Sequence, residues 1–93
     1  MSINNTDIQK ALRIRRVVAK YFENSDETKI QAKELMDEFI EQGIFNKNYK
    51  DGKPIRDFLR FLDENNHLHL IPQVIYEQKE MNKNWYFIKI DLK

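Results

Sequence analysis

The sequence has no cysteine, and it has only two glycines and two prolines among its 93 residues. Without cysteine the chain has no disulfide framework, no thiolate-based zinc site and no thiol nucleophile. Gly43 and Gly52 stand alone, so the sequence also lacks a glycine-rich loop of the kind that binds phosphate. Because secreted proteins of this size usually depend on disulfides, their absence indicates a cytoplasmic location.

Long hydrophobic runs and a strong net charge are missing as well. No apolar stretch approaches the roughly 18 residues of a membrane-spanning helix, and residues 1–7 lack the charged-then-apolar pattern of a signal peptide. Lys and Arg number 16 against 15 Asp and Glu, a net charge of +1. This balance excludes a polybasic protein that holds nucleic acid through bulk charge. We expect a cytoplasmic protein with no membrane partner.

Apolar residues are plentiful for a short chain. They make up 41% of the sequence and include six Phe, four Tyr and one Trp. This content supplies a hydrophobic core and excludes a wholly disordered tail. We expect a single domain over residues 1–93, with an ordered core from about residue 7 to residue 90.

Three segments repeat their apolar residues with the period of a helix. We expect helices over about 7–23, 31–42 and 54–64, the first capped by a side chain at position 6 or 7. Gly43 suits the left-handed position that ends a helix. Pro54 suits the first turn of the third helix, because its missing N–H has no helical partner there.

The remainder of the chain changes to the two-residue period of strands. Ile30 is expected in a short extended stretch, and 67–71 is expected to form a short strand. Segments 73–78 and 85–90 are rich in β-branched and aromatic residues and are separated by a polar tip, which predicts a β-hairpin.

The last strand alternates two sets of apolar residues. We assign Tyr86, Ile88 and Ile90 to the core, which leaves Trp85 and Phe87 facing outward. Outward aromatic residues favour a contact with a partner protein, because aromatic side chains dominate interface hot spots.

The first helix carries a second apolar stripe, formed by Ile14, Val17 and Tyr21, which is either additional core or a dimer contact. Both interpretations stay open. Charged residues line the outer faces of the first two helices: Arg13, Arg16 and Lys20 on the first, and Glu34, Asp37, Glu38 and Glu41 on the second. Such strips are typical of solvated surfaces.

The order of elements resembles the winged helix-turn-helix superfamily over about residues 7–90. The local patterns that carry the resemblance are Ile30-Gln31-Ala32-Lys33-Glu34-Leu35, Gly43-Ile44-Phe45 and Ile55-x-x-Phe58-Leu59-x-x-Leu62. The resemblance implies an α+β fold, a three-helix winged helix-turn-helix with a C-terminal β-hairpin wing. The connection over 43–52 is longer than the 3–4-residue turn of a simple helix-turn-helix.

The resemblance also implies that the third helix enters the major groove of double-stranded DNA and that the wing contacts the flanking backbone. Arginine suits this surface, because its planar fork engages guanine or phosphate with two hydrogen bonds. The candidate DNA-binding residues are Lys47, Tyr49, Lys50, Lys53, Arg56, Arg60, Lys79, Lys83 and Asn84. The implied role is a bacterial or phage regulator of transcription or of a mobile element.

A second hypothesis is a winged-helix adaptor or inhibitor that binds protein and not DNA. The neutral net charge, the acidic strip of the second helix and the outward aromatic residues favour it. Carboxylates beside the arginines of the third helix, such as Asp57, also fit ordinary solvated ion pairs.

Catalysis and metal binding are not expected. His67 and His69 would share one strand face, a spacing that can hold a metal, but only Asp63 and Glu64 lie near them in the sequence. A structural zinc site normally needs four protein ligands. The two serines lie in no nucleophile motif. We therefore expect no metal, no cofactor, no small-molecule substrate and no enzymatic activity.

Overall fold

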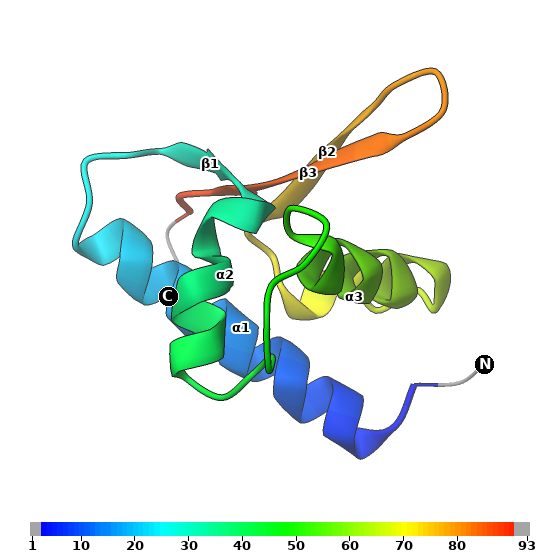
Figure 1. Cartoon of the computed structure of the whole chain (residues 1–93), viewed down its shortest axis with the longest axis horizontal. Coiled ribbons are helices and arrows are strands. Elements are labelled where there is room, and N and C mark those ends of the chain that lie inside the picture. The colour runs from blue at the N-terminus through cyan, green and yellow to red at the C-terminus, as the bar shows by residue number, and fades with distance from the viewer. Residues whose placement is uncertain (1–2, 91–93) are drawn as a thin grey trace.

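The computed structural model describes residues 3–90. Within that range the chain forms three α-helices, two short 3-10 helices and a three-stranded antiparallel sheet (Figure 1). The elements are α1 (Asn5–Glu23), β1 (Lys29–Gln31), η1 (Ala32–Leu35), α2 (Met36–Glu41), α3 (Lys53–Glu64), η2 (Leu68–Leu70), β2 (Val74–Gln78) and β3 (Lys83–Ile88).

Helix α1 begins slightly earlier than the sequence pattern predicts. Asn4 is the N-cap, and its side chain accepts a hydrogen bond from the backbone N–H of Asp7 at 2.9 Å. The Asp7 carboxylate accepts in return from the backbone N–H of Asn4 at 3.2 Å. This reciprocal capping box pairs two N–H groups that a helix N-terminus leaves without partners.

The predicted second helix is divided into two pieces. Its first turn is the 3-10 helix η1, and α2 follows from Met36. As predicted, Gly43 takes a left-handed conformation after the helix, with φ of +74°. The backbone N–H of Ile44 then donates to the carbonyl of Phe39 at 2.8 Å, which closes the end of the helix.

Helix α3 follows the predicted pattern closely. Pro54 lies in its first turn, and Asn65 caps its C-terminus. Gly52 precedes the helix with φ of +91°, and a Cβ atom there would lie 2.4 Å from the Cβ of Lys33. Glycine at this position therefore permits both the turn and the close approach of η1 to the start of α3.

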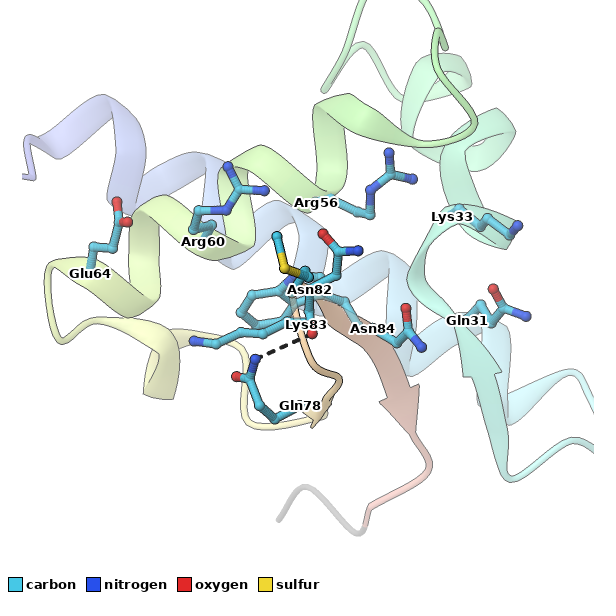
Figure 2. Close-up of a pocket in the computed structure, with 11 residues that line it drawn as sticks. Gln31, Lys33, Arg56, Arg60, Glu64, Gln78, Asn82, Lys83 and Asn84 are labelled. Carbon is cyan, nitrogen blue, oxygen red and sulfur yellow. Dashed lines mark hydrogen bonds between the residues drawn. The ribbon is translucent and has the colours of Figure 1, made fainter.

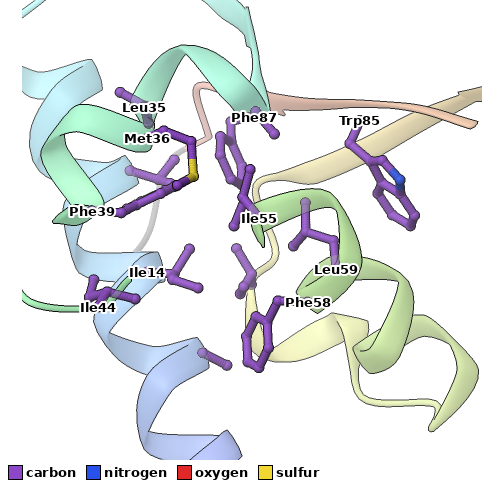
Figure 3. Packing of buried hydrophobic residues seen from close by; sticks show 14 of the residues in the cluster. Ile14, Leu35, Met36, Phe39, Ile44, Ile55, Phe58, Leu59, Trp85 and Phe87 are labelled. Atoms are coloured by element: carbon purple, nitrogen blue, oxygen red, sulfur yellow. The ribbon is translucent and has the colours of Figure 1, made fainter. Parts of the chain in front are cut away.

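The core lies where the three α-helices meet the sheet (Figure 3). The rings of Phe39 in α2 and Phe87 in β3 meet edge to face, with centroids 6.2 Å apart. Ile14 is fully buried in this core, so of the two interpretations left open for it, additional core is correct and dimer contact is wrong. Val17 and Tyr21 pack against the core and remain partly exposed.

The predicted faces of β3 are reversed. Trp85 and Phe87 are 4% and 0% exposed, so neither is an outward contact for a partner, whereas Tyr86 and Ile88 are only partly buried. Both alternating sets are apolar, so the two-residue period alone does not show which set faces the helices. Figure 3 shows Phe87 pointing toward Phe39 and Trp85 lying over α3.

The prediction of a strand over 67–71 is wrong, because Leu68–Leu70 form the 3-10 helix η2. The strand that completes the sheet beside the hairpin is β1, which pairs antiparallel with β3 and places Ile30 opposite Phe87. The strand order is β1-β3-β2, with β3 in the centre. Helix contacts and the neighbouring strands thus bury one face of β3.

The α-helices lie on one side of the sheet, and the β2–β3 hairpin extends beyond them (Figure 1). This α+β arrangement is compatible with the predicted winged-helix layout. Within residues 3–90, no helix combines the length and the apolar character that crossing a bilayer requires.

Candidate nucleic-acid interface

A polar groove of about 670 Å³ lies between α3, the start of η1 and the β2–β3 hairpin. We call it the α3–hairpin groove (Figure 2). Its lining residues are Gln31, Lys33, Arg56, Arg60, Glu64, Gln78, Met81, Asn82, Lys83, Asn84 and Trp85. The buried Trp85 joins this polar surface to the core.

Four of the predicted DNA-binding residues come together in this groove. Arg56 and Arg60 lie one turn apart on α3, outside the buried face formed by Ile55, Phe58, Leu59 and Leu62. Lys83 and Asn84 reach the same groove from the start of β3. Figure 2 shows the two arginines of α3 on the side that faces the hairpin.

Arg56 fastens the loop that precedes α3. Its guanidinium donates one hydrogen bond to the carbonyl of Asp51 and another, at 2.9 Å, to the carbonyl of Lys50. Lys50 and Asp51 both have a positive φ, of 48° and 54°. Arg56 therefore supports a turn whose backbone conformation is uncommon for residues other than glycine.

Arg60 is the more accessible arginine of the groove, with 57% of its side chain exposed. Its guanidinium lies 3.7 Å from Oδ1 of Asp57, and Lys53 Nζ lies 2.6 Å from Oδ2 of the same carboxylate. Lys53 does not line the groove. Asp57 thus divides its two oxygens between a groove cation and a cation outside the groove.

Lys83 ties the hairpin to the end of α3. Its Nζ donates to Oδ2 of Asp63 at 2.8 Å and lies over the rings of Tyr76 and Trp85, 4.4 and 5.6 Å from their centroids. The hydrogen bond to Asp63 raises the pKa of Lys83 above its usual value. The ammonium is therefore held at the wall of the groove by a carboxylate and two aromatic faces.

Lys33 is a groove cation that the sequence interpretation missed. It forms an ion pair with Asp51 at 2.6 Å, and this hydrogen bond lowers the pKa of the Asp51 carboxyl. Gln31, Gln78 and Met81 were missed as well. Gln31 and Lys33 alternate with the buried Ile30 and Ala32, and that alternation is a sequence signal that could have found them.

Side-chain amides supply much of the remaining groove surface. Gln78 donates to the carbonyls of Lys79 and Asn82 at 2.9 and 3.3 Å, which closes the hairpin turn. Gln31 is exposed at one wall of the groove, where it forms a capping box with Glu34. The side-chain amides of Asn82 and Asn84 are also exposed, and they have no hydrogen-bond partner within residues 3–90. They remain available to a ligand as both donors and acceptors.

The other predicted DNA-binding residues lie outside the groove. Lys47, Tyr49 and Lys50 are exposed in the loop before α3, and Lys79 is exposed in the turn of the hairpin. The Lys47 ammonium lies 6.0 Å from the centre of the Tyr49 ring. None of these side chains lines the groove.

Carboxylates offset most of the positive charge of the groove. Asp51, Asp57 and Asp63 each lie within 4.0 Å of a groove cation, and Glu64 is part of the lining. The groove is therefore characterised by positioned hydrogen-bond donors rather than by a large net positive charge.

The histidines form no metal site in the described part of the chain. The rings of His67 and His69 stack with centroids 5.7 Å apart, and Nδ1 of His67 lies 2.5 Å from the carbonyl oxygen of Asn65. No group of three or more potential metal ligands comes together within residues 3–90.

Comparison of the chain with models of known protein families, with curated proteins and with solved structures finds no match in any of the three. The proposed function therefore rests on the geometry of the α3–hairpin groove.

Proposed function

We propose that this chain is a winged-helix protein that binds double-stranded DNA through the α3–hairpin groove. The observation that carries the proposal is the convergence of the exposed Arg60 with the exposed amides of Asn82 and Asn84 in one groove. A role in regulating transcription or a mobile element, in a bacterium or a phage, is proposed by analogy with this fold class alone.

The arginine and amide side chains that line the groove favour a duplex backbone as the ligand. The major groove of B-DNA, about 12 Å wide, admits an α-helix. With α3 in the major groove, the adjacent phosphate strand would pass between α3 and the hairpin. Arginine and amide side chains are the usual donors to phosphate and sugar oxygens, and these contacts fix the register of a protein on DNA.

A salt titration tests whether the protein binds duplex DNA at all. We expect the logarithm of the binding constant to fall with the logarithm of salt concentration, with a slope of about −0.9 for each phosphate neutralised. Fluorescence anisotropy with a random-sequence duplex measures both values. The absence of binding at low salt, at protein concentrations near about 10⁻⁴ M, would contradict the proposal.

Arg60→Ala tests the position of the interface. If Arg60 contacts a base, the variant weakens duplex binding by about 1–3 kcal/mol, and if it contacts a phosphate the salt slope falls by about one unit. Lys89→Ala is the control, because Lys89 is exposed at the end of β3 away from the hairpin turn. An equal loss in both variants would place the duplex elsewhere. Arg56→Ala is unsuitable alone, because it also releases the loop.

The second candidate function is a protein-binding adaptor that does not bind DNA. The observation in its favour is that Asp51, Asp57 and Asp63 already hold cations of the groove. The outward aromatic residues expected from the sequence do not support this function, because Trp85 and Phe87 are buried. The salt titration separates the two functions, since an adaptor shows no duplex binding at low salt.

A further inference from the structure

A second groove, of about 490 Å³, lies between the outer faces of α1 and α2. We call it the α1–α2 groove. Figure 1 shows α2 and the C-terminal half of α1 at the end of the molecule away from the hairpin. A ligand in this groove would leave the α3–hairpin groove open, so the two surfaces can be occupied independently.

The walls of the α1–α2 groove carry opposite charges. Arg16 and Lys20 lie one turn apart on α1, and Glu38 and Glu41 lie one turn apart on α2. All four side chains are exposed, and none of them forms an ion pair with a residue in the range 3–90. Each wall therefore presents a charge of one sign to another molecule.

The space between these charges is partly apolar. Val17 and Tyr21 line the groove from α1 and are only partly buried against the core. The Tyr21 ring packs edge to face on Phe22, with centroids 5.3 Å apart, which holds the tyrosine in place. An apolar centre with a charged rim is the usual composition of a protein interface.

We propose that the α1–α2 groove binds a second copy of this chain and forms a two-fold symmetric dimer. A two-fold contact requires a surface that is complementary to itself. With the symmetry axis along the groove, α1 of each copy lies on α2 of the other. Arg16 and Lys20 of one copy then meet Glu38 and Glu41 of the other, and the same contacts form a second time.

Charge exchange between two variants tests this dimer. The first variant, Arg16→Glu with Lys20→Glu, makes both walls negative, and the second, Glu38→Lys with Glu41→Lys, makes both walls positive. We expect each variant alone to have a dimer dissociation constant at least about tenfold above that of the wild type. An equimolar mixture of the two restores pairing, because every wall then meets one of opposite charge.

Sedimentation velocity between about 10 μM and about 1 mM protein measures these constants. Lys50→Glu with Lys89→Glu is the control, since it changes the net charge as much as the first variant at exposed positions outside the groove. Circular dichroism verifies that each variant is folded. Dimerisation of the control like the wild type, together with restored pairing in the mixture, supports the proposal.

Three results would overturn it. These are a wild-type protein that stays monomeric at about 1 mM, charge variants that dimerise as well as the wild type, and a mixture that remains monomeric. None of them depends on DNA, so the dimer and the proposed DNA binding fail or succeed separately.

Discussion

The two grooves of this molecule differ in whether their charged side chains form ion pairs within the chain. In the α3–hairpin groove, Lys33, Arg60 and Lys83 each lie beside a carboxylate of the same chain, at 2.6, 3.7 and 2.8 Å. In the α1–α2 groove, the two cations of α1 and the two carboxylates of α2 form no ion pair within residues 3–90. The first groove has side chains that the fold positions, whereas the second leaves its charges to be neutralised from outside.

This difference has a physical consequence for binding. An ion pair within the chain restricts a long side chain before any ligand arrives, so less conformational entropy is lost on binding. It also means that a phosphate must compete with a carboxylate for the cation. The α1–α2 groove presents the opposite case. No ion pair within residues 3–90 restricts its charged side chains, so they would lose this entropy on binding the proposed second copy.

The largest effect on stability is expected from Gly52→Ala, which disturbs the close packing of η1 against the start of α3 beside the α3–hairpin groove. Gly52 has φ of +91°, and the new Cβ would lie 2.4 Å from the Cβ of Lys33. Backbone strain and the clash together should lower the free energy of unfolding by about 2–4 kcal/mol. Urea denaturation measures the change.

Gly43→Ala is the matched control, beside the α1–α2 groove. Gly43 also has a positive φ, of +74°, but the nearest atom to its added Cβ would be 3.9 Å away. Only the cost of the left-handed conformation remains, about 1–2 kcal/mol. Equal destabilisation by the two variants would show that the close approach of η1 to α3 is not what requires glycine at position 52.

Helix α3 shows what the sequence can predict about this site. The spacing of Ile55, Phe58, Leu59 and Leu62 predicts its buried face, and all four residues are buried. The direction of Arg60 follows from that face, because residues on the opposite side of a helix must point outward. Local periodicity is sufficient here, since a helix forms its backbone hydrogen bonds within itself.

The hairpin shows where sequence reasoning stops. In β3, Trp85 and Phe87 alternate with Tyr86 and Ile88, and both sets are apolar enough to be core. Which of the two sets is buried depends on the contact with Phe39 and on the pairing with β1, both of which are distant in the sequence. A strand needs its neighbours to define an inner face, so its own pattern leaves two solutions.

The ion pairs of the α3–hairpin groove have the same limitation. Lys33 with Asp51 and Lys83 with Asp63 join residues that the chain brings together only after folding. The pair of Lys53 with Asp57, four residues apart on one helix, is the kind that spacing predicts. Sequence alone therefore places the cations on the surface without showing which are already neutralised.

A smaller effect is expected from Asp63→Asn, which removes the ion pair between α3 and the hairpin. The variant keeps the shape of the side chain and loses the charge that faces Lys83 at 2.8 Å. The urea midpoint should fall by less than in Gly52→Ala, because partly exposed ion pairs contribute little to stability. Glu41→Gln in the α1–α2 groove is the control and should leave the midpoint of the monomer unchanged. A larger shift of the urea midpoint in Glu41→Gln than in Asp63→Asn would contradict the difference proposed between the two grooves.

The smallest effect on stability is expected from removing the ion pair between Asp51 and Lys33. The effect is measured as a difference in stability that depends on pH. The hydrogen bond from Lys33 lowers the pKa of Asp51 in the folded protein. A lowered pKa means that the stabilisation is present above the unfolded value of about 3.9 and is lost as the pH falls through the folded value. Asp51→Asn should therefore lower the urea midpoint at pH 7, and its difference from the wild type should shrink as the pH falls through the folded pKa of Asp51.

Asparagine is the suitable replacement at this position, because it tolerates the positive φ of 54° that Asp51 adopts. Lys33→Gln should reproduce the same pH-dependent difference, and the double variant should add nothing to either single one, since both remove one interaction. A difference between Asp51→Asn and the wild type that does not shrink as the pH falls would show that the backbone turn is responsible. In that case the carboxylate would be free for other contacts, and the groove would be less preorganised than its ion pairs indicate.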